Sequence, residues 1–192
     1  MEHLSAKLPS DFGNFSITVY KQELGRETVV LSTPRLAPHM HPLVRIHSEC
    51  LTGDTFGSLR CDCGPQKEAS LRMIAESGNG VFIYLRQEGR GIGLFEKIKA
   101  YKLQEDGHDT YEANILLGHD ADGRTYAMAK NVLDDLGIDT IKLITNNPKK
   151  VTSMRELGVH VAERIPLIIE ANAHNKHYLD TKKKKFGHHF ND

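Results

Sequence analysis

The three cysteines of the chain have the clearest capacity for chemistry, and they lie within fourteen consecutive positions. Cys50, Cys61 and Cys63 are the only cysteines among the 192 residues. A disulfide would pair two of them and leave one reactive thiol over. A zinc ion would use all three, and three protein ligands with a fourth position open to water are typical of catalytic zinc sites. The spacing therefore indicates a zinc ion that takes part in chemistry.

Two other interpretations of these cysteines stay open at the level of sequence. His47 lies three residues before Cys50 and would complete a closed, structural site of three cysteines and one histidine. The thiols could also be buried without any metal. The Cys61-Asp62-Cys63 segment is polar and has glycine close by, which favours a metal over buried free thiols.

Charge and hydropathy limit the partners of the chain. Lysine plus arginine equal aspartate plus glutamate at 25 each, so no overall charge attracts nucleic acid or a membrane surface. No apolar run approaches the roughly 20 residues that span a bilayer, and residues 1–10 lack the apolar core of a signal peptide. We therefore expect a cytoplasmic protein with a local anion site. Residues 1–192 fit a single domain, with 181–192 as a flexible tail.

The strands and helices expected from the pattern of apolar residues indicate an α/β (α+β) fold, and these elements must position the side chains named above. Residues 12–20 and 28–31 alternate between polar and apolar types, as in antiparallel strands, whereas the apolar run 81–85 is typical of a buried parallel strand. The expected architecture is a mixed sheet with a β-rich N-terminal part followed by βα units, with helices packed on the sheet. Further strands are expected at 43–46, 140–144 and 159–163, and helices from 65 to 77 and at 94–104, 125–136 and 148–157.

A glycine-rich turn follows the strand at 81–85 and precedes a helix. Its glycines would let the backbone approach a ligand, the helix start offers free N–H groups, and Arg86 and Arg90 supply forked donors. An ordinary strand-to-helix turn is the alternative. The two arginines and Glu88 favour a phosphate site.

A second candidate phosphate site follows the strand at 140–144. Asn147 is a natural N-cap with Pro148 in the first helical position, and this cap alone could account for the segment. Lys149 and Lys150 in the first turn oppose the helix dipole, which indicates an anion at that end.

Asp122 and Arg124 stand just before the helix expected at 125–136. They could be a capping residue and a solvated cation. Together they also form an acid and a forked cation suited to proton transfer and phosphoryl charge stabilisation. Tyr101 lies on an apolar helical stripe, where an aromatic residue is more often part of a core than a catalyst.

Five blocks of sequence together resemble the GTP cyclohydrolase II family, and the likeness covers about residues 7–187. The blocks are RIHSECLTGD at 45–54, LRCDCG at 59–64, RQEGRGIGL at 86–94, EAN at 112–114 and TNNPKK at 145–150. The resemblance implies conversion of GTP to formate, pyrophosphate and a diaminopyrimidinone ribosylamine 5′-phosphate, the first step of riboflavin biosynthesis. It also implies a hydrolase acting on cyclic amidine C–N bonds, with Zn²⁺ and Mg²⁺ as cofactors and a homodimeric assembly.

The resemblance assigns roles to individual positions. It implies Cys50, Cys61 and Cys63 as zinc ligands, and Tyr101, Asp122 and Arg124 as catalytic residues. The substrate-binding positions that it implies are Arg45, Ile46, His47, Ser48, Glu49, Gln66, Glu88, Gly89, Arg90, Thr110, Thr145 and Lys150. From the chemistry of the side chains we expect Tyr101 to shuttle a proton, Asp122 to act as general base and Glu88 to accept from guanine N–H groups. Arg124, permanently protonated, is expected to stabilise charge rather than act as a nucleophile.

We expect Arg86, Arg90 and Lys150, with magnesium, to neutralise the triphosphate. A different class of protein, a nucleotide-binding module with a structural zinc and no catalysis, stays open as the alternative.

Overall fold

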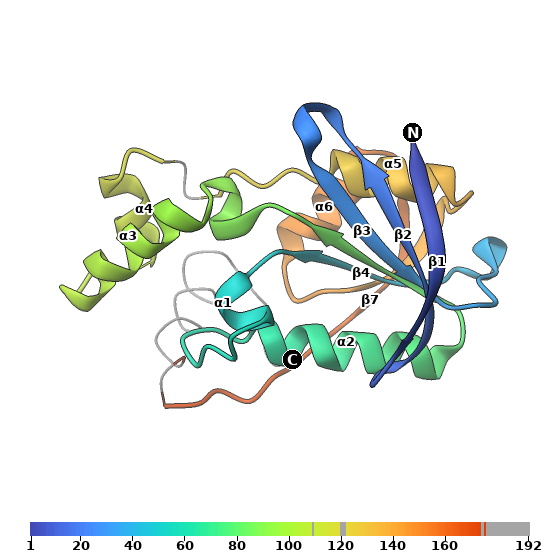
Figure 1. The fold of residues 1–192 in the computed structure, drawn as a ribbon, viewed down its shortest axis with the longest axis horizontal. Helices are drawn as coiled ribbons and strands as arrows, with labels where there is room; N and C mark the ends of the chain where they lie inside the picture. The colour runs from blue at the N-terminus through green and yellow to red at the C-terminus, as the bar shows by residue number, and fades with distance from the viewer. Residues whose placement is uncertain (109, 120–121, 174, 176–192) are drawn as a thin grey trace.

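The computed structural model describes residues 1–108, 110–119, 122–173 and 175 (Figure 1). The expected tail at 181–192 lies outside these residues. Within them, seven strands form one mixed sheet in the order β1-β2-β3-β5-β4-β6-β7. The strands are β1 His3–Ser10, β2 Gly13–Lys21, β3 Glu27–Ser32, β4 Leu43–Ser48, β5 Gly80–Leu85, β6 Thr140–Ile144 and β7 His160–Ile165. The predicted fold class is confirmed.

The sheet changes character in the middle, at β5. Strands β1, β2, β3 and β5 pair antiparallel, which gives the predicted β-rich N-terminal part. Strands β5, β4, β6 and β7 pair parallel and are joined through helices. The carboxyl ends of β4, β5 and β6 therefore meet at one edge of the sheet, the usual place for a ligand in an open α/β sheet.

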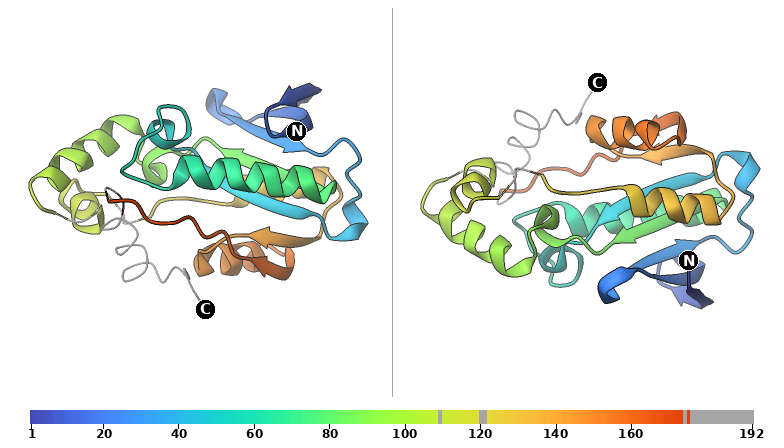
Figure 2. Two further views of the ribbon diagram at one scale, coloured as in Figure 1. Left: turned by 90° about the horizontal axis from the view of Figure 1, so that it is seen from below. Right: turned by 90° about the horizontal axis from the view of Figure 1, so that it is seen from above.

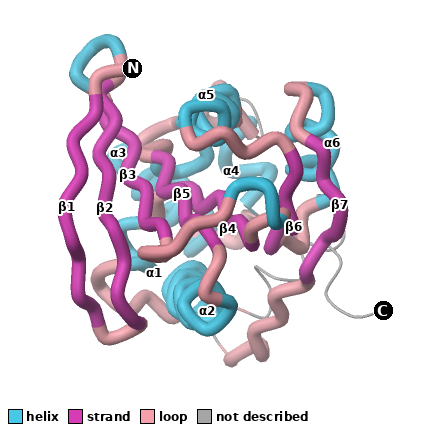
Figure 3. The backbone as a smooth tube through the Cα atoms, turned by 90° about the vertical axis from the view of Figure 1, so that its right-hand side faces the viewer, coloured by secondary structure: helices cyan, strands magenta, loops and turns pink. Residues whose placement is uncertain are grey.

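Helices cover both faces of the sheet (Figures 2 and 3). Helix α2 packs against one face, and α5 and α6 lie on the other. In the described residues the helices are α1 Leu51–Asp54, α2 Cys63–Ser77, α3 Leu94–Glu105, α4 Thr110–Leu116, α5 Ala127–Asp135 and α6 Pro148–Glu156, with short 3-10 turns at Glu23–Gly25, Pro38–Met40 and Glu88–Gly91. None of the helices in the described residues combines the length and apolar character that crossing a bilayer requires.

The two-residue period of β5 explains how the sheet holds two cores. Val81, Ile83 and Leu85 face the core that α5 and α6 cover, whereas Phe82 packs with Ile74 of α2 on the opposite face. Because successive side chains of a strand point to opposite faces, a strand that is buried on both sides must be apolar throughout. This confirms the burial predicted from the apolar run at 81–85, whereas the predicted parallel pairing holds on one side only, since β5 is parallel to β4 and antiparallel to β3.

The sequence missed three elements and misplaced the starts of two helices by two residues each. It did not predict β1, α1 or α4, and it began the second helix at residue 65 instead of Cys63 and the fifth at 125 instead of Ala127. Helices α3 and α4 form an arm that extends away from the sheet (Figure 1). The arm starts beside the edge where β4 and β5 end, so it can carry side chains to that edge.

Candidate active site

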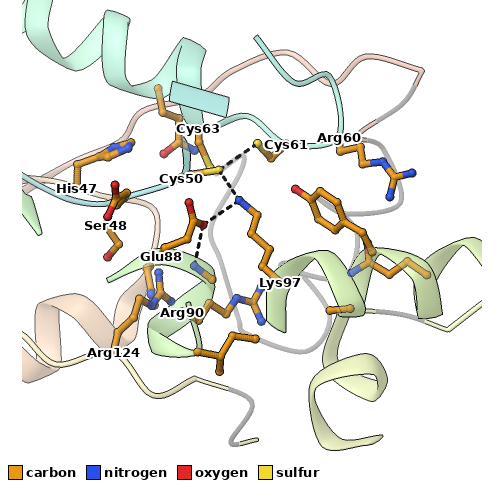
Figure 4. Close-up of a pocket in the computed structure, with 18 of the residues that line it drawn as sticks. His47, Ser48, Cys50, Arg60, Cys61, Cys63, Glu88, Arg90, Lys97 and Arg124 are labelled. Atoms are coloured by element: carbon orange, nitrogen blue, oxygen red, sulfur yellow. Dashed lines mark hydrogen bonds and ion pairs between the residues drawn. The ribbon is translucent and has the colours of Figure 1, made fainter. Parts of the chain in front are cut away.

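A cavity of about 580 Å³ lies at the carboxyl ends of β4, β5 and β6, and the structure brings most of the predicted site residues together there. Figure 4 shows side chains converging on it from the strand ends, the cysteine segment and α3. The predicted residues that line the cavity are Arg45, His47, Ser48, Glu49, Cys50, Cys61, Cys63, Gln66, Glu88, Gly89, Arg90, Tyr101, Arg124, Thr145 and Lys150.

Three of the residues named from sequence are placed differently, and the side chain of a fourth is not described. The Ile46 side chain is buried in the core, and its carbonyl oxygen accepts from Lys150. Asp122 is not among the residues that line the cavity and is paired with Arg124, which does line it. Arg86 does not line the cavity but lies 3.7 Å from Glu27 and 3.8 Å from Glu49, so its role towards the triphosphate stays a prediction. The side chain of Thr110 lies outside the described part of the structure.

The three cysteines form a compact sulfur cluster between the end of β4 and the start of α2. Their sulfur atoms all lie within 4.8 Å of one another, and those of Cys50 and Cys61 are 3.7 Å apart. Sulfur ligands of tetrahedral zinc, with Zn–S near 2.3 Å, lie about 3.8 Å apart. The donor type and the spacing of these residues therefore fit zinc.

Two glycines make this close approach of the cysteines possible. A Cβ atom at Gly53 would lie 2.7 Å from Cys61 Sγ, and one at Gly64 would lie 2.4 Å from the carbonyl oxygen of Gly53. Neither position can hold a larger side chain without movement of the cluster. The glycines thus let α1 and α2 pack closely enough for Cys50, Cys61 and Cys63 to share one ion.

His47 is not a member of the sulfur cluster. Its Nε2 lies 3.0 Å from both carboxylate oxygens of Asp54, and the metal-type cluster found in the described residues contains the cysteines alone. Asp54 also accepts from the Cys50 N–H and the Tyr84 hydroxyl, so it fixes the cysteine segment to β4 and β5. The closed site of three cysteines and His47 is therefore wrong.

The protonation state of His47 follows from its burial. Burial lowers the pKa of His47 and the charge of Arg45 acts in the same direction, which together outweigh the opposing hydrogen bond to Asp54. His47 is therefore neutral near pH 7. Its Nδ1 is buried and has no hydrogen-bond partner in the structure.

Glu88 lines the cavity and has protein partners that the sequence did not predict. Its carboxylate accepts from the N–H groups of Leu51 at 2.6 Å and Gly89 at 2.8 Å, and from the Lys97 ammonium at 2.8 Å. A carboxylate offers about four acceptor sites, so little capacity is left for guanine. Glu88 joins the glycine-rich turn to the start of α1, and its expected contact with guanine stays a prediction.

Lys97 lines the cavity, and sequence reasoning missed it. A lysine on a helix usually marks a solvated face, and Lys97 lies in none of the sequence motifs discussed above. The available signal was its position four residues before Tyr101, since residues at i and i+4 share one face of a helix.

Tyr101 stands close to the sulfur cluster. Its hydroxyl lies 3.3 Å from Thr52 Oγ1, and the Arg60 guanidinium lies over its ring at 4.8 Å from the centroid. Burial raises the pKa of Tyr101, so near pH 7 it is a neutral phenol that can donate or relay a proton. The residue faces the cavity and not a core.

Arg124 and Asp122 form a forked ion pair. Arg124 Nε and Nη2 donate to the two carboxylate oxygens of Asp122 at 2.7 and 2.6 Å. Burial alone would raise the pKa of Asp122, but the hydrogen bonds and charge of Arg124, together with Arg90, outweigh it and lower that pKa. A carboxylate with a lowered pKa is a weak base. The geometry therefore disfavours Asp122 as general base and keeps Arg124 protonated.

The segment after β6 combines a cap with a buried cation. The Asn147 side chain accepts from the Lys149 N–H at 3.0 Å, with Pro148 next to it, which confirms the predicted cap. Lys150 is buried, and its ammonium donates to the Ile46 carbonyl at 2.7 Å, at the end of the cavity next to β4. In the glycine-rich turn after β5, Gly89 and Arg90 both adopt left-handed backbone angles, with φ of 61° and 62°. A non-glycine residue in that conformation is uncommon and is often found at functional sites.

A sulfur cluster and several cations in one cavity at the carboxyl edge of a parallel sheet are features of metal-dependent enzymes that act on anionic substrates. The comparisons with known proteins agree. The model of the family described as GTP cyclohydrolase II matches residues 2–166. The chain is 51% identical over 186 residues to GTP cyclohydrolase-2 of Acinetobacter baumannii (strain AB0057), covering 96% of this chain and 93% of the relative. The chain belongs to the GTP cyclohydrolase II family and is a hydrolase.

A second relative is longer. The riboflavin biosynthesis protein RibBA of Bacillus subtilis (strain 168) is 54% identical over 183 residues, which cover 94% of this chain and 46% of the relative. Among solved structures, a two-domain 3,4-dihydroxy-2-butanone 4-phosphate synthase from A. baumannii aligns with a TM-score of 0.42 and 16% identity over 88% of this chain and 40% of that one. A similarity this low supports no conclusion about the present protein.

Proposed function

We propose that this chain is a zinc-dependent GTP cyclohydrolase II that converts GTP to formate, pyrophosphate and a diaminopyrimidinone ribosylamine 5′-phosphate. The observation that carries the proposal is that a sulfur cluster with zinc spacing and the cations Arg90, Arg124 and Lys150 line the same cavity. One substrate that needs both is a purine nucleoside triphosphate. The name of the Bacillus subtilis relative supports a place in riboflavin biosynthesis.

The metal end of the cavity would open the purine ring. Cys50, Cys61 and Cys63 would hold zinc, which supplies Lewis acidity and activates water for attack on the carbon that leaves as formate. Tyr101 stands beside this end as a neutral phenol and would pass a proton to the ring nitrogen.

The cationic end would bind the triphosphate and release pyrophosphate. Arg90, Lys150 and Mg²⁺ would balance the charge of the phosphates. Arg124, held by its two hydrogen bonds to the Asp122 carboxylate, would stabilise the charge that develops as water attacks the α-phosphate. Because the ion pair with Asp122 keeps the guanidinium protonated, Arg124 has no lone pair with which to form a covalent bond to the nucleotide. Asp122 would orient Arg124 rather than remove a proton.

The remaining expectations belong to the same proposal. His47, Arg45 and Gln66 would form the wall beside the base, with Ser48, Glu49, Thr110 and Thr145 as further substrate contacts. The protein would act as a single-domain, cytoplasmic homodimer.

Incubation with GTP, Zn²⁺ and Mg²⁺ followed by mass spectrometry of the products tests the function. The proposal expects formate and pyrophosphate in equal amounts, with a pyrimidine product that carries one phosphate. A product that keeps the formyl carbon or the pyrophosphate would indicate a different ring-opening enzyme. GTP binding without turnover by the zinc-loaded protein would indicate a nucleotide-binding module.

The substitution Cys61→Ser separates the two halves of the reaction. If zinc serves ring opening alone, Cys61→Ser abolishes formate release while part of the pyrophosphate release survives. Removal of zinc from the unmodified protein with a chelator is the matched control and should give the same pattern. Equal loss of both products would contradict this division and mean that the metal also organises the phosphate end.

A further inference from the structure

Lys97 of α3 reaches the sulfur cluster from the arm. Its Nζ lies 3.3 Å from Cys50 Sγ, 3.0 Å from Thr52 Oγ1 and 2.8 Å from Glu88 Oε1. The ammonium group has three N–H donors, so these three acceptors use all of them. Figure 4 shows the group between Cys50 and Glu88, and the side chain is only 11% exposed.

We propose that Lys97 is a positioning residue of the metal site, where its ammonium donates to the Cys50 sulfur and offsets the negative charge of the three-cysteine ligand set. This inference rests on the proposed zinc site. It assigns to Lys97 an action on the metal through Cys50 and not a direct contact with the substrate.

Charge balance gives the physical reason. Three thiolates and one Zn²⁺ sum to a net charge of −1, and Cys50 and Cys61 are buried. A buried negative charge without a partner is costly. The Lys97 ammonium is a positive charge in hydrogen-bond contact with one of the sulfurs, and it therefore lowers the cost of assembling the site.

The surroundings of Lys97 hold it in this place. Glu88, which is 9% exposed, accepts from Lys97 and is itself fixed by the Leu51 N–H at the start of α1. The pair Lys97–Glu88 could by itself be a structural link between the arm and the cysteine segment. The contact with Cys50 separates the two roles, because only a donor to the sulfur changes the electronic properties of a bound metal.

Cobalt(II) in place of zinc makes this difference visible. Thiolate-bound cobalt absorbs in the near ultraviolet by charge transfer from sulfur to metal, and a hydrogen bond to the sulfur stabilises its lone pairs and raises the transition energy. The experiment compares the cobalt spectra of the unmodified chain and Lys97→Met, and measures zinc affinity by competition with a chromophoric chelator. Lys99→Met is the matched control, because Lys99 is on the same helix, is 49% exposed and pairs with Glu96.

We expect Lys97→Met to move the charge-transfer band to longer wavelength and to weaken zinc binding by about 10–100-fold, the usual effect of losing an outer-shell partner. Lys99→Met should match the unmodified chain in both measurements.

If Lys97→Met fails to fold because Glu88 is left buried without its partner, the double variant Lys97→Met/Glu88→Gln removes both charges and should show the same shift. An unchanged band and affinity in either Lys97 variant would overturn the role of Lys97. Absence of a sulfur-to-cobalt band from the unmodified chain would overturn the zinc site itself, and with it this proposal.

Discussion

Gly53 offers a test of whether the geometry of the cysteines, and not only their presence, determines metal binding. In Gly53→Ala the new Cβ would lie 2.7 Å from Cys61 Sγ, whereas ordinary contact begins at 3.4 Å. The Cys61 sulfur would therefore have to move by about 0.7 Å. Zinc sites tolerate deviations of about 0.2 Å in their ligand distances, so the required shift is several times larger than a zinc site accepts.

From this shift we expect Gly53→Ala to lower zinc affinity by at least about 10-fold. Overpacking should also reduce the free energy of unfolding by about 1–3 kcal/mol. Chelator competition measures the first quantity and denaturant unfolding of the metal-free protein measures the second. Formate release at saturating zinc shows whether the Gly53→Ala variant is active once zinc is bound.

Gly57→Ala is a control for the loss of stability alone. Gly57 has a φ of 64°, and a Cβ atom there would have no neighbouring atom within 4 Å, so alanine introduces backbone strain without touching a sulfur. The strain costs about 1–2 kcal/mol, which is similar to the overpacking cost. Zinc affinity should stay normal in Gly57→Ala. Equal zinc affinities in the two variants would refute the argument from sulfur geometry.

Two further predictions concern stability. The Tyr20 hydroxyl donates to Asp135 at 2.9 Å, and neither residue lines the cavity. Tyr20→Phe should therefore lower the free energy of unfolding by about 1 kcal/mol and leave formate release per bound zinc unchanged; a loss of activity at equal zinc content would contradict this. Asp122 has a folded-state pKa below its usual value, because Arg124 and Arg90 outweigh its burial. Its ionised form therefore stabilises the fold above the usual carboxyl range, and this contribution is lost as the pH falls through the lowered pKa. The difference in unfolding free energy between the unmodified chain and Asp122→Asn should shrink on acidification in denaturant titrations, and a difference that grows at low pH would show that the sign is wrong.

The sequence predicted those parts of the fold and site whose signals are local. The apolar run at 81–85 identified a strand buried on both faces, and the cysteine spacing identified the sulfur cluster. Strand β1 was missed because its side chains are almost all exposed and its conformation depends on pairing with β2. Leu4, Ala6 and Leu8 do alternate with polar residues, and this two-residue period was a signal that could have predicted the strand.

Contacts between distant residues explain the other misses. Lys97 meets Cys50, 47 positions away, and nothing near Lys97 in sequence distinguishes it from a solvated lysine. Asp54 lies inside a motif, yet its contact with Tyr84 spans 30 positions and depends on the register of β4 with β5. The protein partners of Glu88 were missed for the same reason, because one of its donors is the backbone N–H of Leu51, 37 positions away.

The two ends of the cavity differ in the sequence separation of the residues that form them. Cys50 and Cys61 are 11 positions apart, whereas the contact of Lys150 with Ile46 spans 104 positions. The entropy lost in closing a loop grows with the logarithm of its length, and distant pairings form slowly. The sulfur cluster can therefore assemble early, from one short segment of a growing or refolding chain. Lys150 reaches its place only after β6 has paired beside β4, so the part of the cavity that Lys150 lines is completed last.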